Sequence, residues 1–330
     1  MKVDDLRTTL KKYDTNALTE IIVALYKIIP KSRKENDSLD EFLKNFSLEK
    51  KKTAKKEVSV DYPALEMEIE QLIEYANASY YLAPNRYVNK EKRSKWRFEV
   101  RRIIKELISV SGENNEGAAQ MFASIYEMLS YCCNYYVFRT QDPFSAVGYN
   151  QPELLDCVLR KIFHNGVDQD SIKKAVFLTL DSNVDRETLH SELLWVLMER
   201  LKTPDAKEIA LNKCVEFIET FDRYQAAKGV FRYSIKYDDY HKNKCIENTA
   251  ELYLKIKLSL HEYDEGIAFF WQHYSRYNNK EITLYVLLWI LGIKELHDLW
   301  ISEYEKAVKK GIDPREELQE EYAKRKSIEK

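Results

Sequence analysis

The strongest chemical signal in the sequence is a basic stretch from Arg86 to Lys105, which contains nine Lys or Arg residues and only two Glu residues. Helical spacing places five of these cations opposite an apolar stripe: Lys95, Arg97, Arg101, Arg102 and Lys105. A cationic helix face of this kind can bind phosphates, nucleic-acid bases or an acidic partner helix. The alternative is a surface helix whose cations pair with carboxylates of the preceding helix: Glu66, Glu70 and Glu74.

Aromatic residues provide the second signal, since the chain contains 23 Tyr, 13 Phe and 5 Trp. Two short segments hold more aromatic side chains than a single helical stripe buries. Six of them are predicted to face a partner groove: Tyr131, Tyr135, Tyr136, Phe270, Trp271 and Tyr274. Because tyrosine and tryptophan anchor partner peptides, these residues predict a protein- or peptide-binding surface. A tyrosine-rich core is the alternative interpretation.

A near match to a calcium-binding loop runs from Asp181 to Glu192, with oxygen-bearing side chains at alternate positions. Arg186 stands where that loop needs Gly, and Leu189 supplies no side-chain oxygen. We therefore predict that Asp185 is the N-cap of the following helix and not a calcium ligand.

The other candidate ligands are dispersed along the chain. None of the six histidines forms a known metal-binding spacing, and His241, the centre of the densest polar cluster, would need partners from distant helices. The five cysteines include no C-x-x-C pair, so neither a disulfide framework nor a zinc site is indicated. We expect no metal and no cofactor, and reduced thiols that are mostly buried, as in a cytoplasmic protein.

Composition predicts the elements that must position these residues. With only 8 Gly and 7 Pro in 330 residues, the sharp turns of a sandwich, barrel or Rossmann fold are hard to supply, so the chain is predicted to be all-α. Helix caps and breakers recur at short intervals, which predicts antiparallel helix pairs stacked as an α-solenoid; a compact multi-helix bundle is the alternative. The net charge of −2 creates no general attraction for polyanions.

The domain organisation follows from shifts in composition. Residues 1–47 form a small helical module, 48–60 a lysine-rich linker, and 61–330 the main helical domain. The N-terminus lacks a signal-peptide pattern, and the longest apolar stretch, 282–293, is too short to cross a bilayer. We expect a cytoplasmic protein without membrane association.

Apolar periodicity predicts which residues each helix buries. Three stripes are expected to be buried: Leu18, Ile21, Ile22 and Leu25; Leu65, Ile69, Leu72, Ile73 and Ala76; and Trp96, Val100, Ile103, Ile104 and Leu107. Asp14 is the predicted N-cap of the second helix, at 17–29, and Asp61 is the predicted N-cap of the first helix after the linker. Separate helices are expected at 186–202, 205–221 and 224–236. The turn-rich segment 140–152 predicts an ordered loop or a second domain boundary.

One short segment resembles a known repeat. Residues 262–271 resemble the turn and second helix of a tetratricopeptide repeat, with Gly266 at the small-residue position and Phe270 at the aromatic one. The preceding helix departs from the motif at Leu254 and Lys257. The resemblance implies a partner-binding repeat protein. The opening 47 residues also resemble a short helical module at the start of uncharacterised bacterial proteins, which implies no activity.

Three functions are therefore ranked. A non-catalytic protein- or peptide-binding helical scaffold comes first, and nucleic-acid or other polyanion binding through residues 86–105 comes second. A helical-bundle enzyme is third, because the sequence holds no phosphate-binding loop, dinucleotide motif or nucleophile elbow. Such an enzyme would need carboxylates or histidines from separate helices to converge in one pocket.

Overall fold

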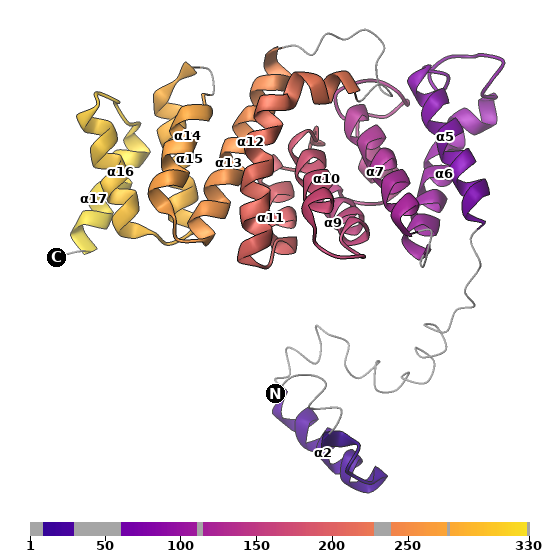
Figure 1. Ribbon diagram of the computed structural model, residues 1–330, viewed down its shortest axis with the longest axis horizontal. Coiled ribbons are helices and arrows are strands. Elements are labelled where there is room, and N and C mark those ends of the chain that lie inside the picture. Colours follow the sequence, from indigo (N-terminus) through magenta and orange to yellow (C-terminus); the bar gives the residue numbers. More distant parts are fainter. Residues whose placement is uncertain (1–8, 30–60, 111–114, 228–238, 276–277, 329–330) are drawn as a thin grey trace. The chain divides into compact units, whose positions relative to one another are not determined.

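The structure is a computed structural model that describes residues 9–29, 61–110, 115–227, 239–275 and 278–328 (Figure 1). Helices and the turns between them account for the described residues, which contain no β-strand, so the fold is all-α as predicted. The helices are α2 (Thr15–Ile28), α5 (Tyr62–Asn77), α6 (Lys90–Ser109), α7 (Asn115–Cys132), α8 (Pro143–Val147), α9 (Gln151–Ile162), α10 (Gln169–Leu180), α11 (His190–Arg200), α12 (Pro204–Ala227), α13 (Asp239–Ser259), α14 (Tyr263–His273), α15 (Lys280–Ile293), α16 (His297–Lys309) and α17 (Glu316–Ile328). No described helix has both the length and the apolarity needed to cross a bilayer.

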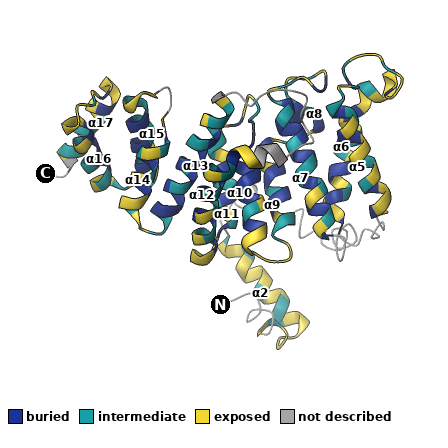
Figure 2. Ribbon diagram, turned by 45° about the horizontal axis from the view of Figure 1, so that its top comes forward, coloured by how far each residue is buried: buried dark blue, intermediate teal, exposed yellow. Residues whose placement is uncertain are grey.

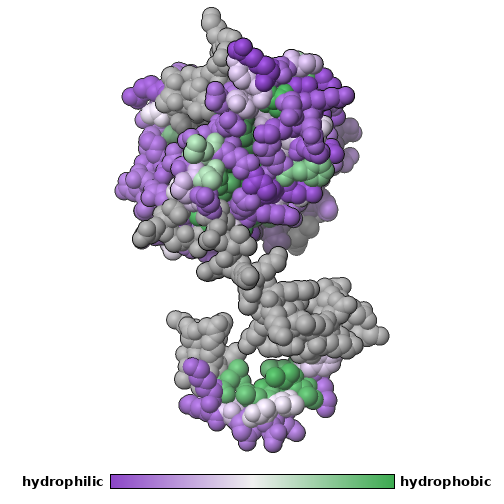
Figure 3. Space-filling view, turned by 90° about the vertical axis from the view of Figure 1, so that its right-hand side faces the viewer, coloured by the Kyte–Doolittle hydropathy of each residue, from purple (hydrophilic) through white to green (hydrophobic). Residues whose placement is uncertain are grey.

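The chain divides into two units, residues 1–59 and 60–330. In the first unit, Asp14 caps α2 as predicted, since its carboxylate accepts a hydrogen bond of 2.7 Å from Ala17 N–H. The predicted burial of the α2 stripe is wrong, because no residue of α2 is buried. Leu18 and Ile21 are half-buried, while Ile22 is 52% exposed and Leu25 is 58% exposed. Figure 3 shows hydrophobic side chains gathered on this described part of the first unit. The predicted linker 48–60 lies outside the described residues.

The second unit opens with two helices whose buried faces were predicted correctly. The Asp61 carboxylate accepts a hydrogen bond from Ala64 N–H and so caps α5. All five predicted residues of α5 are buried, and so are all five of α6. On α6, Trp96 stacks on Phe138 with ring centroids 3.9 Å apart, which ties the basic helix to the segment that follows α7.

The helices of the second unit pack mainly on neighbours in the sequence. The principal contacts run from α5 and α6 to α7, then through α9, α10, α11 and α12 to α13, and on through α14, α15 and α16 to α17. Figure 1 shows these helices side by side as a row, and Figure 2 shows buried residues along the helices of this unit. Several of the main contacts join helices two elements apart in the chain, as in α7 with α9, α9 with α11 and α10 with α12.

Helix α13 separates two hydrophobic cores. Leu252 and Ile256 belong to a core built with α5 to α12, whereas Ala250, Leu254 and Leu258 belong to a second core built with α14 to α17. Residues two positions apart on a helix point about 200° apart, so the alternation buries opposite faces of α13. Helix α13 is therefore shared by both halves of this unit.

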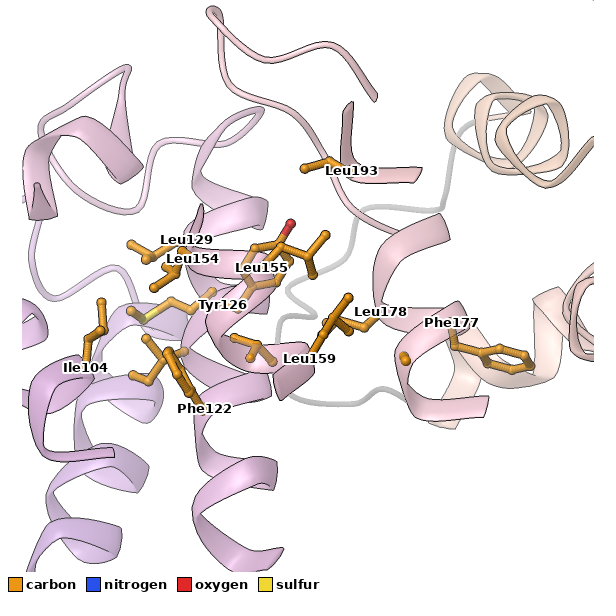
Figure 4. Packing of buried hydrophobic residues seen from close by; sticks show 14 of the residues in the cluster. Ile104, Phe122, Tyr126, Leu129, Leu154, Leu155, Leu159, Phe177, Leu178 and Leu193 are labelled. Atoms are coloured by element: carbon orange, nitrogen blue, oxygen red, sulfur yellow. The ribbon is translucent and has the colours of Figure 1, made fainter. Parts of the chain in front are cut away.

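Tyr126 lies among the buried hydrophobic residues of the first core (Figure 4), and its hydroxyl belongs to a buried hydrogen-bond network. The Tyr126 hydroxyl accepts a hydrogen bond of 3.1 Å from Gln151 Nε2, while Ser182 Oγ lies 3.3 Å from it. Gln151 Nε2 also donates to the Asn183 carbonyl at 2.7 Å, and Asn183 N–H donates to Ser130 Oγ at 2.8 Å. These bonds satisfy the buried backbone of the loop after α10 and fix that loop on α7 and α9.

Two sequence expectations differ from the structure. Of the two alternatives for residues 140–152, the domain boundary is absent and the segment is ordered. It contains the short helix α8, which buries Phe144 and Val147 and ends at Gly148 in a left-handed conformation. Helix α12 runs from Pro204 to Ala227, so the break expected near residue 222 is absent within this described helix. The remainder of the predicted helix 224–236 lies outside the described residues.

Helices α13 and α14 approach closely at Gly266. A Cβ atom added to Gly266 would lie 2.8 Å from Lys257 Cβ and 3.3 Å from Leu254 Cδ1. Lys257 and Leu254 are the two residues at which the sequence departs from the tetratricopeptide motif. The Lys257 ammonium also pairs with Glu262 and, at 2.6 Å, with Glu265. Burial disfavours the charged form of Lys257, but the hydrogen bonds to these carboxylates raise its pKa above the usual value.

We predict that Gly266→Ala destabilises the protein by about 1–3 kcal/mol, because the added methyl group overlaps a Cβ atom of α13. Gly292→Ala is the matched control, since its nearest non-local atom lies 3.6 Å away in the Arg325 side chain. This control should leave stability unchanged or raise it by up to about 1 kcal/mol through helix propensity. Denaturant unfolding followed by circular dichroism measures both; equal stability of the two variants would contradict the close approach.

Candidate functional site

The predicted cations of α6 have several partners within the protein. Arg102 pairs with Glu68 and with Glu106, and Lys95 pairs with Glu91 at 2.5 Å. Arg101 Nε donates a hydrogen bond of 2.7 Å to the Val147 carbonyl, which places the guanidinium against α8. Arg97 and Lys105 are exposed, and the Arg97 guanidinium lies 4.9 Å from the centroid of the Phe98 ring.

The ion pairs between α5 and the cationic face of α6 differ from those expected from the sequence. The only ion pair between α5 and α6 among the described residues is Glu68–Arg102, so Glu66, Glu70 and Glu74 do not form the predicted pairs with Arg97, Arg101 and Lys105. Glu66 instead accepts a hydrogen bond from the Tyr62 hydroxyl. The difference is one of helix face: Glu68, which pairs with Arg102, lies two positions from both Glu66 and Glu70 and therefore points about 200° away from them around α5.

The predicted groove aromatics do not form one surface. Tyr131 and Tyr135 stack at 4.4 Å near the end of α7, and Tyr136 is 66% exposed beside them. Phe270 is fully buried in the second core, where Trp271 packs at its edge. Tyr274 is also mostly buried, yet it lines a cleft that the sequence did not identify.

This cleft, the α13–α15 cleft, has a volume of about 810 Å³. Its walls are the segment 184–191, the first half of α13, the end of α14 with the segment after it, and α15. Its aromatic side chains are Tyr240, Tyr274, Tyr285 and Trp289, and its amide side chains are Asn243, Asn248 and Asn278. Tyr240 is 66% exposed and Trp289 is 43% exposed, so two large aromatic faces are open to solvent at this cleft.

Besides Glu251, two residues of the cleft hold buried polar atoms that lack a hydrogen-bond partner among the described residues. These atoms are Nδ2 of Asn248 and both ring nitrogens of His190. Leaving such a group buried without a partner costs about 1–3 kcal/mol, and natural proteins contain few of them. A ligand or water in the cleft is the simplest source of the missing hydrogen bonds.

A buried ion pair lies in the wall of the cleft. Glu251 Oε1 and Lys255 Nζ lie 2.7 Å apart one turn from each other on α13, and the Lys255 side chain is 2% exposed. The angles at these two atoms do not satisfy those of a hydrogen bond, so the contact is an ion pair only. Lys255 and Lys294 both approach the Trp195 ring, with Nζ-to-centroid distances of 5.0 and 4.3 Å. Burial lowers the pKa of Lys294, and the positive charge of Lys255 lowers it further.

Close to the cleft residues Tyr240 and Lys244 in the chain, His241 and Cys245 of α13 meet Asp181, which follows α10. Asp181 ends α10, and His241 and Cys245 stand one turn apart on α13. The His241 Nε2 atom lies 2.8 Å from Asp181 Oδ1 and 3.5 Å from Cys245 Sγ, while Sγ and Oδ1 are 3.9 Å apart. The Asp181 and His241 side chains are only 5% and 14% exposed.

The segment that resembles a calcium loop does not gather its oxygen atoms. Asp181 contacts His241, Asn183 Oδ1 accepts a hydrogen bond from Asn134, and Asp185 accepts one from Glu187 N–H. The predicted N-cap at Asp185 is wrong, because α11 begins at His190, with Leu189 as its N-cap residue. The Asp185 carboxylate forms a turn within the loop instead.

Sequence reasoning missed the cleft and the Asp181–His241–Cys245 cluster for the same reason. Both combine residues that lie tens of positions apart in the chain, and no local motif links residue 181 to residue 241. A partial signal was present, since His241 and Cys245 have the i, i+4 spacing that places two side chains on one helix face. Asp181 was identified only as part of the calcium-loop pattern.

We predict that His190 makes the protein acid-sensitive. Burial lowers the pKa of His190 to about 3, and the positive charge of Lys244 lowers it further. The unfolded chain binds a proton at this histidine near pH 6.5 whereas the folded chain does not, so stability falls as the pH decreases from about 6.5 toward 3. For one proton the slope approaches about 1.4 kcal/mol per pH unit.

Urea unfolding between pH 7 and pH 5 measures this slope. His190→Gln should flatten it, whereas His164→Gln, at an exposed site, should leave it unchanged. The range stays above pH 5, because the Glu216 and Glu281 carboxyls, whose pKa is lowered by ion pairing, lose their contribution below it. An identical slope in the wild type and His190→Gln would show that His190 is protonated in the folded protein.

Known proteins offer no identification of these features. No protein-family model, curated protein or solved structure matches the chain. The function of the cleft must therefore be inferred from the residues that line it.

Proposed function

We propose that the protein is a non-catalytic helical scaffold that binds a peptide segment of a partner protein in the α13–α15 cleft. The observation that supports this function is the combination, in one cleft, of solvent-exposed aromatic faces with amide side chains. Specific pockets are mostly apolar, with a few polar groups that orient the ligand. The proposed binding surface therefore differs from the groove predicted from the sequence. Of the six aromatic residues of that predicted groove, only Tyr274 lines this cleft.

The chemistry of the lining favours a peptide over a small charged metabolite. Tyr285 and Trp289 lie one turn apart on α15 and offer flat apolar surfaces for an aliphatic or aromatic side chain of the peptide. An asparagine side chain both donates and accepts hydrogen bonds, which matches the N–H and C=O groups of a peptide backbone. The buried Nδ2 group of Asn248, unpartnered among the described residues, would donate to a peptide carbonyl.

The scaffold supports the same proposal. We propose that the helix pairs of residues 61–330 stack as a solenoid, because their principal contacts follow the order of the sequence. Stacked helix pairs present long surfaces on which a peptide can lie, and the resemblance of residues 262–271 to a tetratricopeptide repeat implies the same use. A cleft of about 810 Å³ accommodates a few residues of such a peptide.

We predict that Trp289→Ala weakens peptide binding by at least about 30-fold, because a central tryptophan contributes about 2 kcal/mol or more to an interface. Peptides would be selected from a displayed library with the full-length protein, synthesised, and titrated by fluorescence anisotropy. Tyr136→Ala is the matched control, since Tyr136 is an exposed aromatic residue that does not line the cleft.

Three results would overturn the proposal: no peptide is enriched, the selected peptides bind Trp289→Ala as tightly as the wild type, or Tyr136→Ala weakens binding equally. Nucleic-acid binding through α6 is separated from peptide binding by the salt dependence of affinity. Phosphate contacts weaken steeply between 50 and 200 mM salt, whereas apolar anchors do not. Oligonucleotide binding that is abolished by Arg97→Glu with Lys105→Glu would replace the first proposal with the second.

A further inference from the structure

We propose that Asp181, His241 and Cys245 form a binding site for a divalent transition-metal ion of the zinc type. No metal was expected from the sequence, because Asp181 lies 60 or more positions away from the His241–Cys245 pair of α13. The structure brings one carboxylate oxygen, one imidazole nitrogen and one sulfur atom within 4.8 Å of one another, and this cluster can hold a metal ion.

The separations between these atoms lie within about half an ångström of those in a tetrahedral coordination shell. With zinc bonds of about 2.0–2.2 Å to nitrogen and oxygen and about 2.3 Å to sulfur, donor atoms in a tetrahedron lie about 3.3–3.6 Å apart. The distance between His241 Nε2 and Cys245 Sγ is 3.5 Å, and that between Sγ and Asp181 Oδ1 is 3.9 Å. When an ion replaces the hydrogen bond, the 2.8 Å contact between Nε2 and Oδ1 must lengthen by about half an ångström, and the 3.9 Å separation of Sγ and Oδ1 must shorten by about 0.3 Å.

The donor set selects the class of metal. A thiolate and an imidazole favour zinc and similar transition metals, whereas calcium and magnesium take oxygen ligands. Metal binding requires the Cys245 thiol to release its proton to solvent, so that a sulfur–metal bond replaces the S–H bond. Three protein ligands leave a fourth position for water.

Rigid elements hold the three donors. His241 and Cys245 share one face of α13, where the i, i+4 spacing brings their side chains together. Asp181 is the C-cap residue of α10, and the loop that follows it is fixed by Ser130 and Gln151. The His241 ring also lies against Phe221, with ring centroids 6.2 Å apart. Donors that are pre-positioned in this way lose little conformational entropy on binding an ion.

The site is independent of the proposed peptide cleft. None of its three ligands lines that cleft, although Tyr240 and Lys244, their neighbours on α13, do. Loss of metal binding and loss of peptide binding are therefore separate outcomes.

Titration of the metal-free full-length protein with Co²⁺ tests the proposal, because a thiolate bound to Co²⁺ produces a charge-transfer band in the near-ultraviolet. We expect this band at one equivalent of Co²⁺, with visible bands of a tetrahedral ion, and its loss on addition of Zn²⁺. Cys245→Ala should abolish the band and weaken Zn²⁺ binding by at least about 100-fold. Asp181→Asn, which keeps the side-chain shape, should weaken Zn²⁺ binding without unfolding the protein.

Cys214→Ala is the matched control: it removes another buried free cysteine, on α12, and should leave the band intact. Circular dichroism confirms that each variant is folded. If Cys245→Ala fails to fold, the wild type, Asp181→Asn and Cys214→Ala still decide the question. Absence of the band in the wild type, its persistence in folded Cys245→Ala, its loss in folded Cys214→Ala, or unchanged Zn²⁺ affinity of Asp181→Asn would overturn the proposal.

Discussion

The burial of both faces of α13 is the constraint on which the second unit depends. One face contributes Leu252 and Ile256 to the first core, and the other contributes Leu254 and Leu258 to the second. A helix at the surface needs only one apolar stripe, but a helix between two cores must be apolar on two sides. The remaining positions of α13 carry its polar residues, which are consequently forced close to, or into, the protein interior.

Both candidate sites are consequences of that arrangement. Polar side chains of α13 that cannot reach solvent freely must find partners: Glu251 and Lys255 pair with each other, and Lys257 pairs with two glutamates of the α14 hairpin. Toward its N-terminal end, α13 directs His241 and Cys245 at Asp181 and lines the cleft with Asn248. A helix that joins two cores thus also concentrates the buried polar groups from which binding sites are built.

Local signals predicted the local structure well. Caps at Asp14 and Asp61 and the stripes of α5 and α6 follow from hydrogen-bonding groups and apolar spacing within a few residues. The exposed Ile22 and Leu25 show where such spacing fails, because periodicity identifies an apolar face but not what covers it. Phe270 and Trp271 were assigned to a groove for the same reason, since aromatic content does not distinguish a core from a cleft. The approach of Asp181 to His241 depends on the packing of α10 on α13, which no short segment encodes.

The sequential packing of the helices has a consequence for how the chain acquires its structure during synthesis. Because contacts link helices that are near neighbours in the sequence, the first core can assemble as soon as α13 has left the ribosome, before α15, α16 and α17 exist. At that moment Leu254 and Leu258 would face solvent. The short turn from α13 to α14 limits this interval, since the helix that first covers them is the next one to be translated. Synthesis from the N-terminus therefore leaves the apolar face of one helix at a time uncovered.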